Sequence, residues 1–278
     1  MKRLVVCLLA LALVLAYAGI AAAEDPEVFT SGEYEYVVLE DGTAEIAGFT
    51  GNGDFVIPSE LDGYAVSSVG NHALDGYSGM NGIVFPETPV HIGDGAFANQ
   101  SLTRINIPES VVSVGNNPFS SNTILSEITV SPDHPYLAVM DGSLVSLEDM
   151  RLVTYPVGLK ADTYAIPDGI REIGGYAFAM SDKLTVITIP DSVTAIDDMA
   201  FVLCSKLTEI VIPDGVTVIG EGAFSYCFGL IRAVIPESVT SIGINAFTMC
   251  PGLTAVVVPG SYAEQYCQAL EIRYTYPE

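Results

Sequence analysis

Apolar and polar positions alternate along the chain in a pattern that returns every 23 residues. Each unit reads Leu-x-x-Ile-x-Ile-Pro, as at Leu207, Ile210, Ile212 and Pro213. Two residues spaced by two point to one face of a strand, so Ile210 and Ile212 are expected to face a core. Proline donates no ladder hydrogen bond and therefore ends the strand. The pattern predicts one short strand followed by one turn in every unit.

The same residue types return at the same places through most of the chain. In the later units prolines lie 23 residues apart, and a phenylalanine follows by 11 residues. These residues are Pro167, Pro190, Pro213, Pro236 and Pro259, with Phe178, Phe201, Phe224 and Phe247. One unit cannot bury its own apolar face, so it must stack on a neighbour at about 4.8 Å, the spacing of hydrogen-bonded strands. The sequence therefore predicts a solenoid in which equal residues form continuous columns.

The segment LTEIVIPDGVTVIGEGAFSYC, residues 207–227, is similar to the BspA-type leucine-rich repeat, a bacterial repeat of about 23 residues. The resemblance covers nearly all of residues 34–276. It implies a right-handed leucine-rich-repeat solenoid, with short parallel strands on the concave side and turns and short helices on the convex side. It also implies adhesion or recognition of proteins or glycans at a cell surface.

The ends and the middle of the chain depart from the repeat. Residues 34–49 alternate on both sides of an Asp-Gly turn, which predicts a hairpin that caps the first coil. Residues 260–278 place Tyr262, Tyr266 and Leu270 on one helix face and are expected to form the opposite cap. Between repeats at 54–130 and 166–259, residues 131–165 predict a β-meander insertion. This insertion is interpreted either as an elaborated loop or as a binding projection.

The first 23 residues have the organisation of a secretory signal. Lys2 and Arg3 precede an apolar run over residues 4–20, and small residues then lead to a predicted cleavage site between Ala23 and Glu24. A retained membrane helix is the alternative, but a bilayer needs about 20 apolar residues. Residues 24–278 are then the repeat domain, expected to be secreted or held at a bacterial surface, with no further transmembrane segment.

The charge of the chain limits the classes of partner that it can bind. The formal net charge is −24, and the acidic residues are spread along the sequence rather than gathered in a tail. Such a charge repels phosphate backbones, so nucleic acid is excluded as a partner. The expected partner is an extracellular protein or glycan.

Strand residues that point away from the core form the predicted binding surface, since solenoids usually bind on their concave face. Three successive outward valines favour a partner site, whereas the alternative is that valine simply suits a strand. The predicted binding residues are Val186, Thr188, Glu209, Val211, Arg232, Val234, Ala255 and Val257.

Acidic residues follow the prolines and form a weaker candidate site. Stacked carboxylates suggest a calcium ladder, but aspartate is also a common turn residue. The column consists of Asp168, Asp191, Asp214 and Glu237.

Cys204, Cys227 and Cys250 also lie 23 residues apart, and Cys267 follows in the C-terminal cap. Buried free thiols, a disulfide within the column or to Cys267, and a metal site remain open. Parallel sulfurs do not converge on one ion, which disfavours the metal site.

Motifs of catalysis or of cofactor binding were not found in the sequence, and its histidines lie in different coils. We therefore expect a non-enzymatic binding protein without a cofactor. A structural scaffold without a specific ligand and, less favoured, a secreted hydrolase or metal-dependent enzyme are the alternatives.

Overall fold

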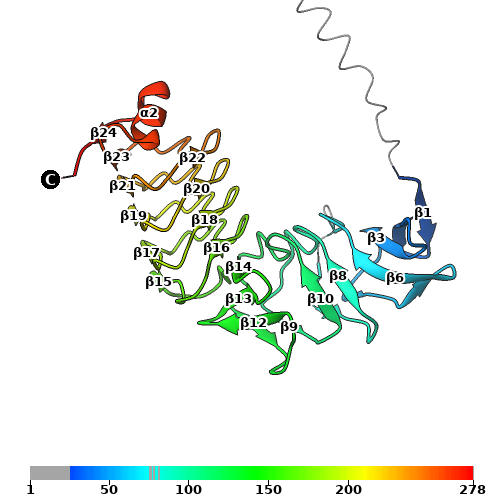
Figure 1. The fold of residues 1–278 in the computed structure, drawn as a ribbon. Coiled ribbons are helices and arrows are strands. Elements are labelled where there is room, and N and C mark those ends of the chain that lie inside the picture. The colour runs from blue at the N-terminus through cyan, green and yellow to red at the C-terminus, as the bar shows by residue number, and fades with distance from the viewer. Residues whose placement is uncertain (1–25, 75–76, 78, 81, 278) are drawn as a thin grey trace, which may run out of the picture.

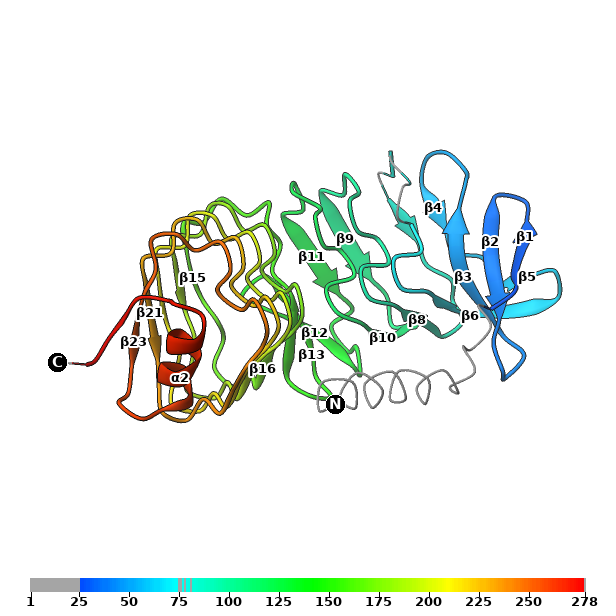
Figure 2. The same ribbon diagram turned by 90° about the horizontal axis from the view of Figure 1, so that it is seen from above.

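The computed structural model describes residues 26–74, 77, 79–80 and 82–277. The predicted cleavage site at Ala23 and Glu24 lies outside the described residues. The chain winds into an elongated solenoid of stacked parallel strands, and two arms meet at an angle near its middle (Figures 1 and 2). The predicted leucine-rich-repeat solenoid is confirmed.

The N-terminal arm begins with an antiparallel cap. Strand β1 (Val28–Ser31) pairs with β2 (Tyr34–Val38), which pairs with β3 (Ala44–Phe49). Strand β3 then pairs in parallel with β6 (Tyr64–Val69), the first of the stacked strands in this sheet. The predicted hairpin therefore covers the otherwise open edge of the first coil.

Each following coil of this arm contributes strands to two ladders. One ladder continues from β6 through β8 (Val90–Ile92) and β10 (Val111–Val114). The other consists of the pairs β4 (Phe55–Val56) with β7 (Ile83–Val84) and β9 (Arg104–Ile107) with β11 (Glu127–Val130). A short strand β5 (Glu60–Leu61) pairs antiparallel with β6.

The C-terminal arm repeats the two ladders with greater regularity. The first ladder holds β15 (Thr163–Ala165), β17 (Val186–Thr188), β19 (Glu209–Val211), β21 (Arg232–Ile235), β23 (Thr254–Val257) and β24 (Tyr274–Thr275). The second ladder holds β16 (Glu172–Ile173), β18 (Ala195–Ile196), β20 (Val218–Ile219) and β22 (Ser241–Ile242).

The turn segments that contain the phenylalanines are also hydrogen-bonded from coil to coil. The Phe178 N–H donates to the Ala200 carbonyl and the Phe201 N–H to the Ala223 carbonyl, both at 2.8 Å. These segments are turns rather than the expected short helices. The described helix is α2 (Tyr262–Ala269), which closes the C-terminal end and is capped by the Ser261 side chain. No described helix has the length and apolar character that a membrane span requires.

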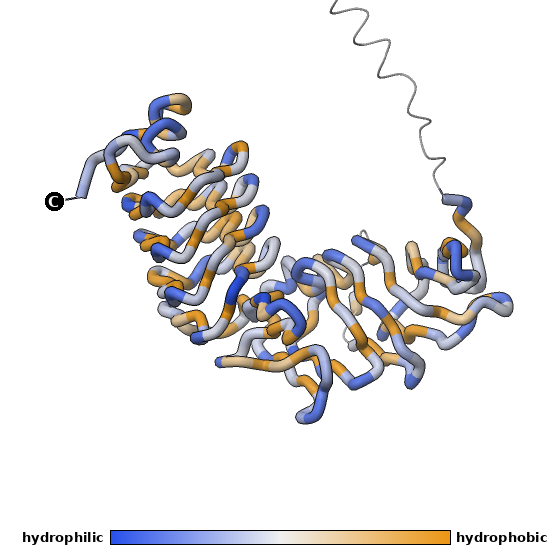
Figure 3. The backbone as a smooth tube through the Cα atoms, viewed as in Figure 1, coloured by the Kyte–Doolittle hydropathy of each residue, from blue (hydrophilic) through white to orange (hydrophobic). Residues whose placement is uncertain are grey.

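The core is a set of aligned columns, visible as recurring apolar positions along the C-terminal arm in Figure 3. Phe201 stacks on Phe224 with ring centroids 4.9 Å apart and planes within 4°. Phe178 and Phe247 extend the stack at 5.0 and 5.2 Å. These distances match the spacing of hydrogen-bonded strands, about 4.8 Å, so ring stacking and strand pairing support each other.

The predicted meander occupies the junction of the arms. Strands β12 (Leu137–Met140), β13 (Ser143–Ser146) and β14 (Arg151–Thr154) are antiparallel, and β14 then pairs in parallel with β16. Tyr155 follows β14 and stacks on Phe178 at 5.2 Å, in the place that phenylalanine takes in other coils. The insertion therefore enters the second ladder and the core instead of projecting as a separate loop.

The insertion widens the solenoid on one side only. On the turn side the two arms touch, because the Asn117 side-chain amide donates to the Tyr176 carbonyl at 2.7 Å. On the opposite side, β11 and β15 belong to separate sheets. The chain bends where the insertion lies, with the meander on the outside of the bend and the turn segments on the inside (Figure 1).

We expect Phe201→Ala to lower the free energy of unfolding by about 3–5 kcal/mol, because the stack loses a fully buried ring and keeps a cavity. Chemical denaturation followed by circular dichroism measures the change. Phe228→Ala is the matched control, since the Phe228 side chain is 48% exposed and its loss should change stability by less than about 1 kcal/mol. Equal losses in the two variants would contradict the role of the stack.

Candidate functional site

The outward side chains of β17, β19 and β21 form a continuous surface, which we call the strand face. It carries six of the eight predicted binding residues: Val186, Thr188, Glu209, Val211, Arg232 and Val234. Val186 and Val211 are 47% and 52% exposed, while Val234 is half-buried. The strand face is thus an apolar surface with polar residues between its valines.

A groove of about 330 Å³ lies in the strand face between β17 and β19. Val186, Thr188, Glu209 and Val211 line it, and Ile187 closes it from the core side. The two strands pair at Val186 and Glu209. Four of the predicted residues therefore line one concavity, within the range of about 300–1,000 Å³ typical of ligand pockets.

The prediction was wrong for Ala255 and Val257, which are 1% and 0% exposed. Strand β23 is shifted by one residue, because Thr254 pairs with Arg232 although 22 residues separate them. In the previous coil Ile231 lies between Leu230 and the start of β21, whereas in this coil Leu253 directly precedes β23. A shift of one residue moves every side chain of a strand to the other face, so both residues join the core.

An ion pair crosses the strand face from Glu209 on β19 to Arg232 on β21. Both side chains are about half exposed, so the pair contributes little to stability. Asp191 adds a further carboxylate beside the groove. The strand face therefore combines exposed valines with a predominantly acidic border.

The acidic column Asp168, Asp191, Asp214 and Glu237 lies at the turns after the first ladder, and all four side chains are exposed. Within the part of the chain that the structure describes, no group of three or more His, Cys, Asp or Glu side chains is placed to hold a metal ion. The column is a set of separate turn carboxylates, and the calcium hypothesis gains no support from their arrangement.

The four described cysteines Cys204, Cys227, Cys250 and Cys267 are free thiols. In the column, each Sγ donates to the carbonyl of a phenylalanine in the preceding coil, as from Cys227 to Phe201 at 3.2 Å. The neighbouring thiol of Cys204 and burial raise the pKa of Cys227, and burial raises the pKa of Cys267 to about 11. The column acts as core packing with a weak polar contact rather than as a disulfide or metal site.

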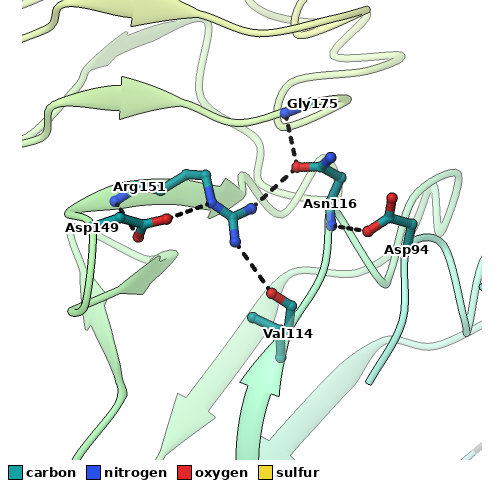
Figure 4. Close-up of polar contacts among 6 residues, drawn as sticks. All are labelled: Asp94, Val114, Asn116, Asp149, Arg151 and Gly175. Atoms are coloured by element: carbon teal, nitrogen blue, oxygen red, sulfur yellow. Dashed lines mark hydrogen bonds and ion pairs between the residues drawn. The ribbon is translucent and has the colours of Figure 1, made fainter. Parts of the chain in front are cut away.

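The junction of the arms holds a polar network that the sequence did not reveal (Figure 4). Arg151 on β14 donates to the Val114 carbonyl at 3.2 Å and to Asn116 Oδ1 at 3.1 Å. Its Nε also pairs with Asp149 at 3.1 Å. The Arg151 side chain is 14% exposed, and it thus joins the last coil of one arm to the meander.

Asn116 is the centre of this network. Its Oδ1 also accepts from the Gly175 N–H at 3.3 Å, and its backbone N–H donates to Asp94 Oδ1 at 2.7 Å. The residues joined by this contact are 59 positions apart, so no pattern in the local sequence indicates it. The available sequence signal is the 35-residue gap between Pro132 and Pro167, which locates the insertion but not its partners.

Comparison with known proteins gives a consistent family match. A family model described as the BspA type leucine rich repeat region matches residues 54–141 and 158–271 in six copies. No sequence match was found among curated proteins.

Three solved bacterial structures share the fold. A leucine-rich cell surface protein from Faecalibacterium prausnitzii is 22% identical, with 88% of this chain and 98% of that chain covered and a TM-score of 0.53. A leucine-rich repeat protein from Eubacterium ventriosum is 20% identical, with 84% and 78% covered and a TM-score of 0.58. The pneumococcal vaccine antigen PcpA is 14% identical, with 91% and 99% covered and a TM-score of 0.54. At these identities the likeness shows the fold alone.

The thiols of Cys204, Cys227 and Cys267 should react slowly with iodoacetamide at pH 8, because burial shields them and a raised pKa lowers the thiolate fraction. After denaturation all four thiols of residues 24–278 should react, as counted by mass spectrometry. For Cys267, the rate should rise with pH until about 11. Fewer than four reactive thiols in the denatured chain would contradict the free-thiol assignment.

We expect Arg151→Met to lower the free energy of unfolding by about 1.5–3 kcal/mol, since the Val114 carbonyl and Asn116 lose a charged donor. Small-angle scattering should also show a changed maximum dimension, because this side chain joins the arms. Arg171→Met is the control, as the Arg171 side chain is exposed and should tolerate the change. An unchanged stability in Arg151→Met would disprove the bracing role.

Proposed function

The chain belongs to the BspA-type leucine-rich repeat family, and from this premise we propose that it is an exported, non-enzymatic binding protein. In this proposal the strand face holds an extracellular protein partner. The groove between β17 and β19, lined by exposed valines, is the observation that carries the proposal.

Export is supported by the first residues of the sequence. A basic start, an apolar run and small residues before Glu24 form the order that signal peptidases recognise. The structural likeness to a protein described as a cell surface protein is consistent with this location. We therefore place the repeat domain outside a bacterial cell, either secreted or retained at its surface.

A binding role fits the side chains better than a catalytic role does. His134, for example, is 5% exposed, and its Nδ1 accepts from the Leu137 N–H at 3.0 Å, so it stabilises the start of β12. Enzymes need an accessible acid, base or nucleophile near a concave site. The strand-face groove instead offers valine and threonine side chains with the carboxylates of Asp191 and the paired Glu209, and its described lining holds no His, Cys, Ser or Lys.

The chemistry of the strand face specifies a class of partner. Exposed valines suit an apolar patch on another protein, since the centres of protein interfaces are depleted of charge. The net charge of −24 and the acidic border at Asp191 and Glu209 favour a partner with basic residues around that patch. Electrostatic attraction of this kind speeds association and weakens with added salt.

The combined variant Val186→Glu and Val211→Glu should weaken binding at least tenfold, because it places charges in the apolar part of the interface. Surface plasmon resonance of residues 24–278 against immobilised extracellular-matrix proteins and mucins measures the effect. Val218→Glu is the matched control, since Val218 is 42% exposed but lies on the second ladder.

Binding that is equal in the combined variant and the unmodified protein would exclude the strand face. Absence of binding to every protein in the panel would instead support the scaffold alternative. Raising the salt concentration should lower the association rate if the partner is basic.

A further inference from the structure

A cavity of about 360 Å³ lies in the inner angle between the two arms. Its volume falls within the range of about 300–1,000 Å³ that small-molecule sites occupy. It shares no lining residue with the strand-face groove. The turn segments of both arms line it, including Asp94, Asn99 and Ser120 from one arm and Tyr176, Met180 and Leu203 from the other.

The N-terminal arm supplies a polar wall. Asn116 lines the cavity, and its side-chain Nδ2 makes no hydrogen bond to the part of the chain that the structure describes, since the junction engages its Oδ1 (Figure 4). The side chains of Asn99 and Ser120 make no hydrogen bond to any residue that the structure describes. Asp94 uses Oδ1 to accept from the Asn116 N–H. This wall therefore offers both donors and acceptors to a ligand.

The C-terminal arm supplies an apolar wall built on strained backbone. Tyr176, Met180 and Leu203 have φ angles of 58°, 62° and 62°. Bulky residues rarely adopt this left-handed conformation, which costs of order 1–3 kcal/mol. It recurs in other coils, as at Tyr226 and Met249. The same turn holds Gly95 and Asn99 in one coil of the N-terminal arm and Gly222 in a coil of the C-terminal arm, and these residues suit it. The turn itself therefore does not require the bulky side chains that line the cavity.

The charge of the cavity limits the ligand. None of the described residues that line it is Lys or Arg, and Asp94 contributes a carboxylate. Together with the net charge of −24, this disfavours phosphates, carboxylates and acidic sugars. A neutral ligand with an apolar side for the tyrosine and several hydroxyl groups for the amides fits this lining.

A neutral sugar ring has this combination, because its C–H groups form an apolar face and its hydroxyls both donate and accept. We propose that the inner-angle cavity binds a neutral sugar ring between Tyr176 and the polar wall of Asn99, Asn116 and Ser120. The site lies on the turn side of the solenoid and goes beyond the protein-binding role of the strand face.

Ligand-observed NMR titration of residues 24–278 with the methyl glycosides of glucose, galactose, mannose and N-acetylglucosamine tests the proposal. At least one glycoside should bind with a Kd of about 1 mM or lower, which corresponds to about −4 kcal/mol. Tyr176→Asn should weaken that binding at least tenfold. Tyr226→Asn is the matched control, because Tyr226 also has a φ of 58° and is 44% exposed but lies outside the cavity.

Thermal unfolding separates a binding role of Tyr176 from a structural one. Asparagine suits the left-handed backbone, so Tyr176→Asn should keep or raise the Tm while it removes sugar binding. The strand-face variant Val186→Glu with Val211→Glu should bind the sugar normally. The proposal is overturned if no neutral glycoside binds, if Tyr176→Asn binds as the unmodified protein does, or if glucuronate binds as tightly.

Discussion

The stacking of each coil on the next at the spacing of paired strands is the constraint on which the whole structure depends. It brings Phe201 and Phe224 to 4.9 Å, aligns the carbonyls that accept from the turn N–H groups, and places the thiols of the cysteine column beside phenylalanine carbonyls, as at Cys227. A residue that fits one coil must therefore fit its neighbours above and below. This is why the inward positions repeat and the outward positions vary.

The same constraint explains the bend. An insertion can enter a stacked solenoid only if it continues a ladder, and β14 does so by pairing with β16 while Tyr155 replaces the phenylalanine. The other ladder has no such continuation between β11 and β15. Because the insertion adds strands on one side of the solenoid only, the two arms meet at an angle. The polar contacts of Arg151 and Asn116 hold this angle.

The repeat, its caps and the meander could be predicted from the sequence, because each has a local signal of spacing or turn chemistry. Two features could not. The burial of Ala255 and Val257 follows from a one-residue shift in the pairing of β23 with β21, which the regular spacing from Pro236 to Pro259 conceals. The junction depends on contacts such as Asn117 to Tyr176, and nothing in a 59-residue separation marks two residues as neighbours.

The turns of the two arms show how such a fold can acquire different surfaces. Their backbone is held by hydrogen bonds to the next coil, as from Met180 to Val202 and from Leu203 to Ser225. Hydrogen bonds from a neighbouring coil can hold a residue in a backbone conformation that its own side chain disfavours. Glycine and asparagine occupy these turn positions in both arms, as at Gly95 and Asn245, while other coils of the C-terminal arm hold Tyr, Met and Leu there. Stacking thus separates the choice of surface side chain from the stability of the turn, and the bend then brings the turns of the two arms face to face.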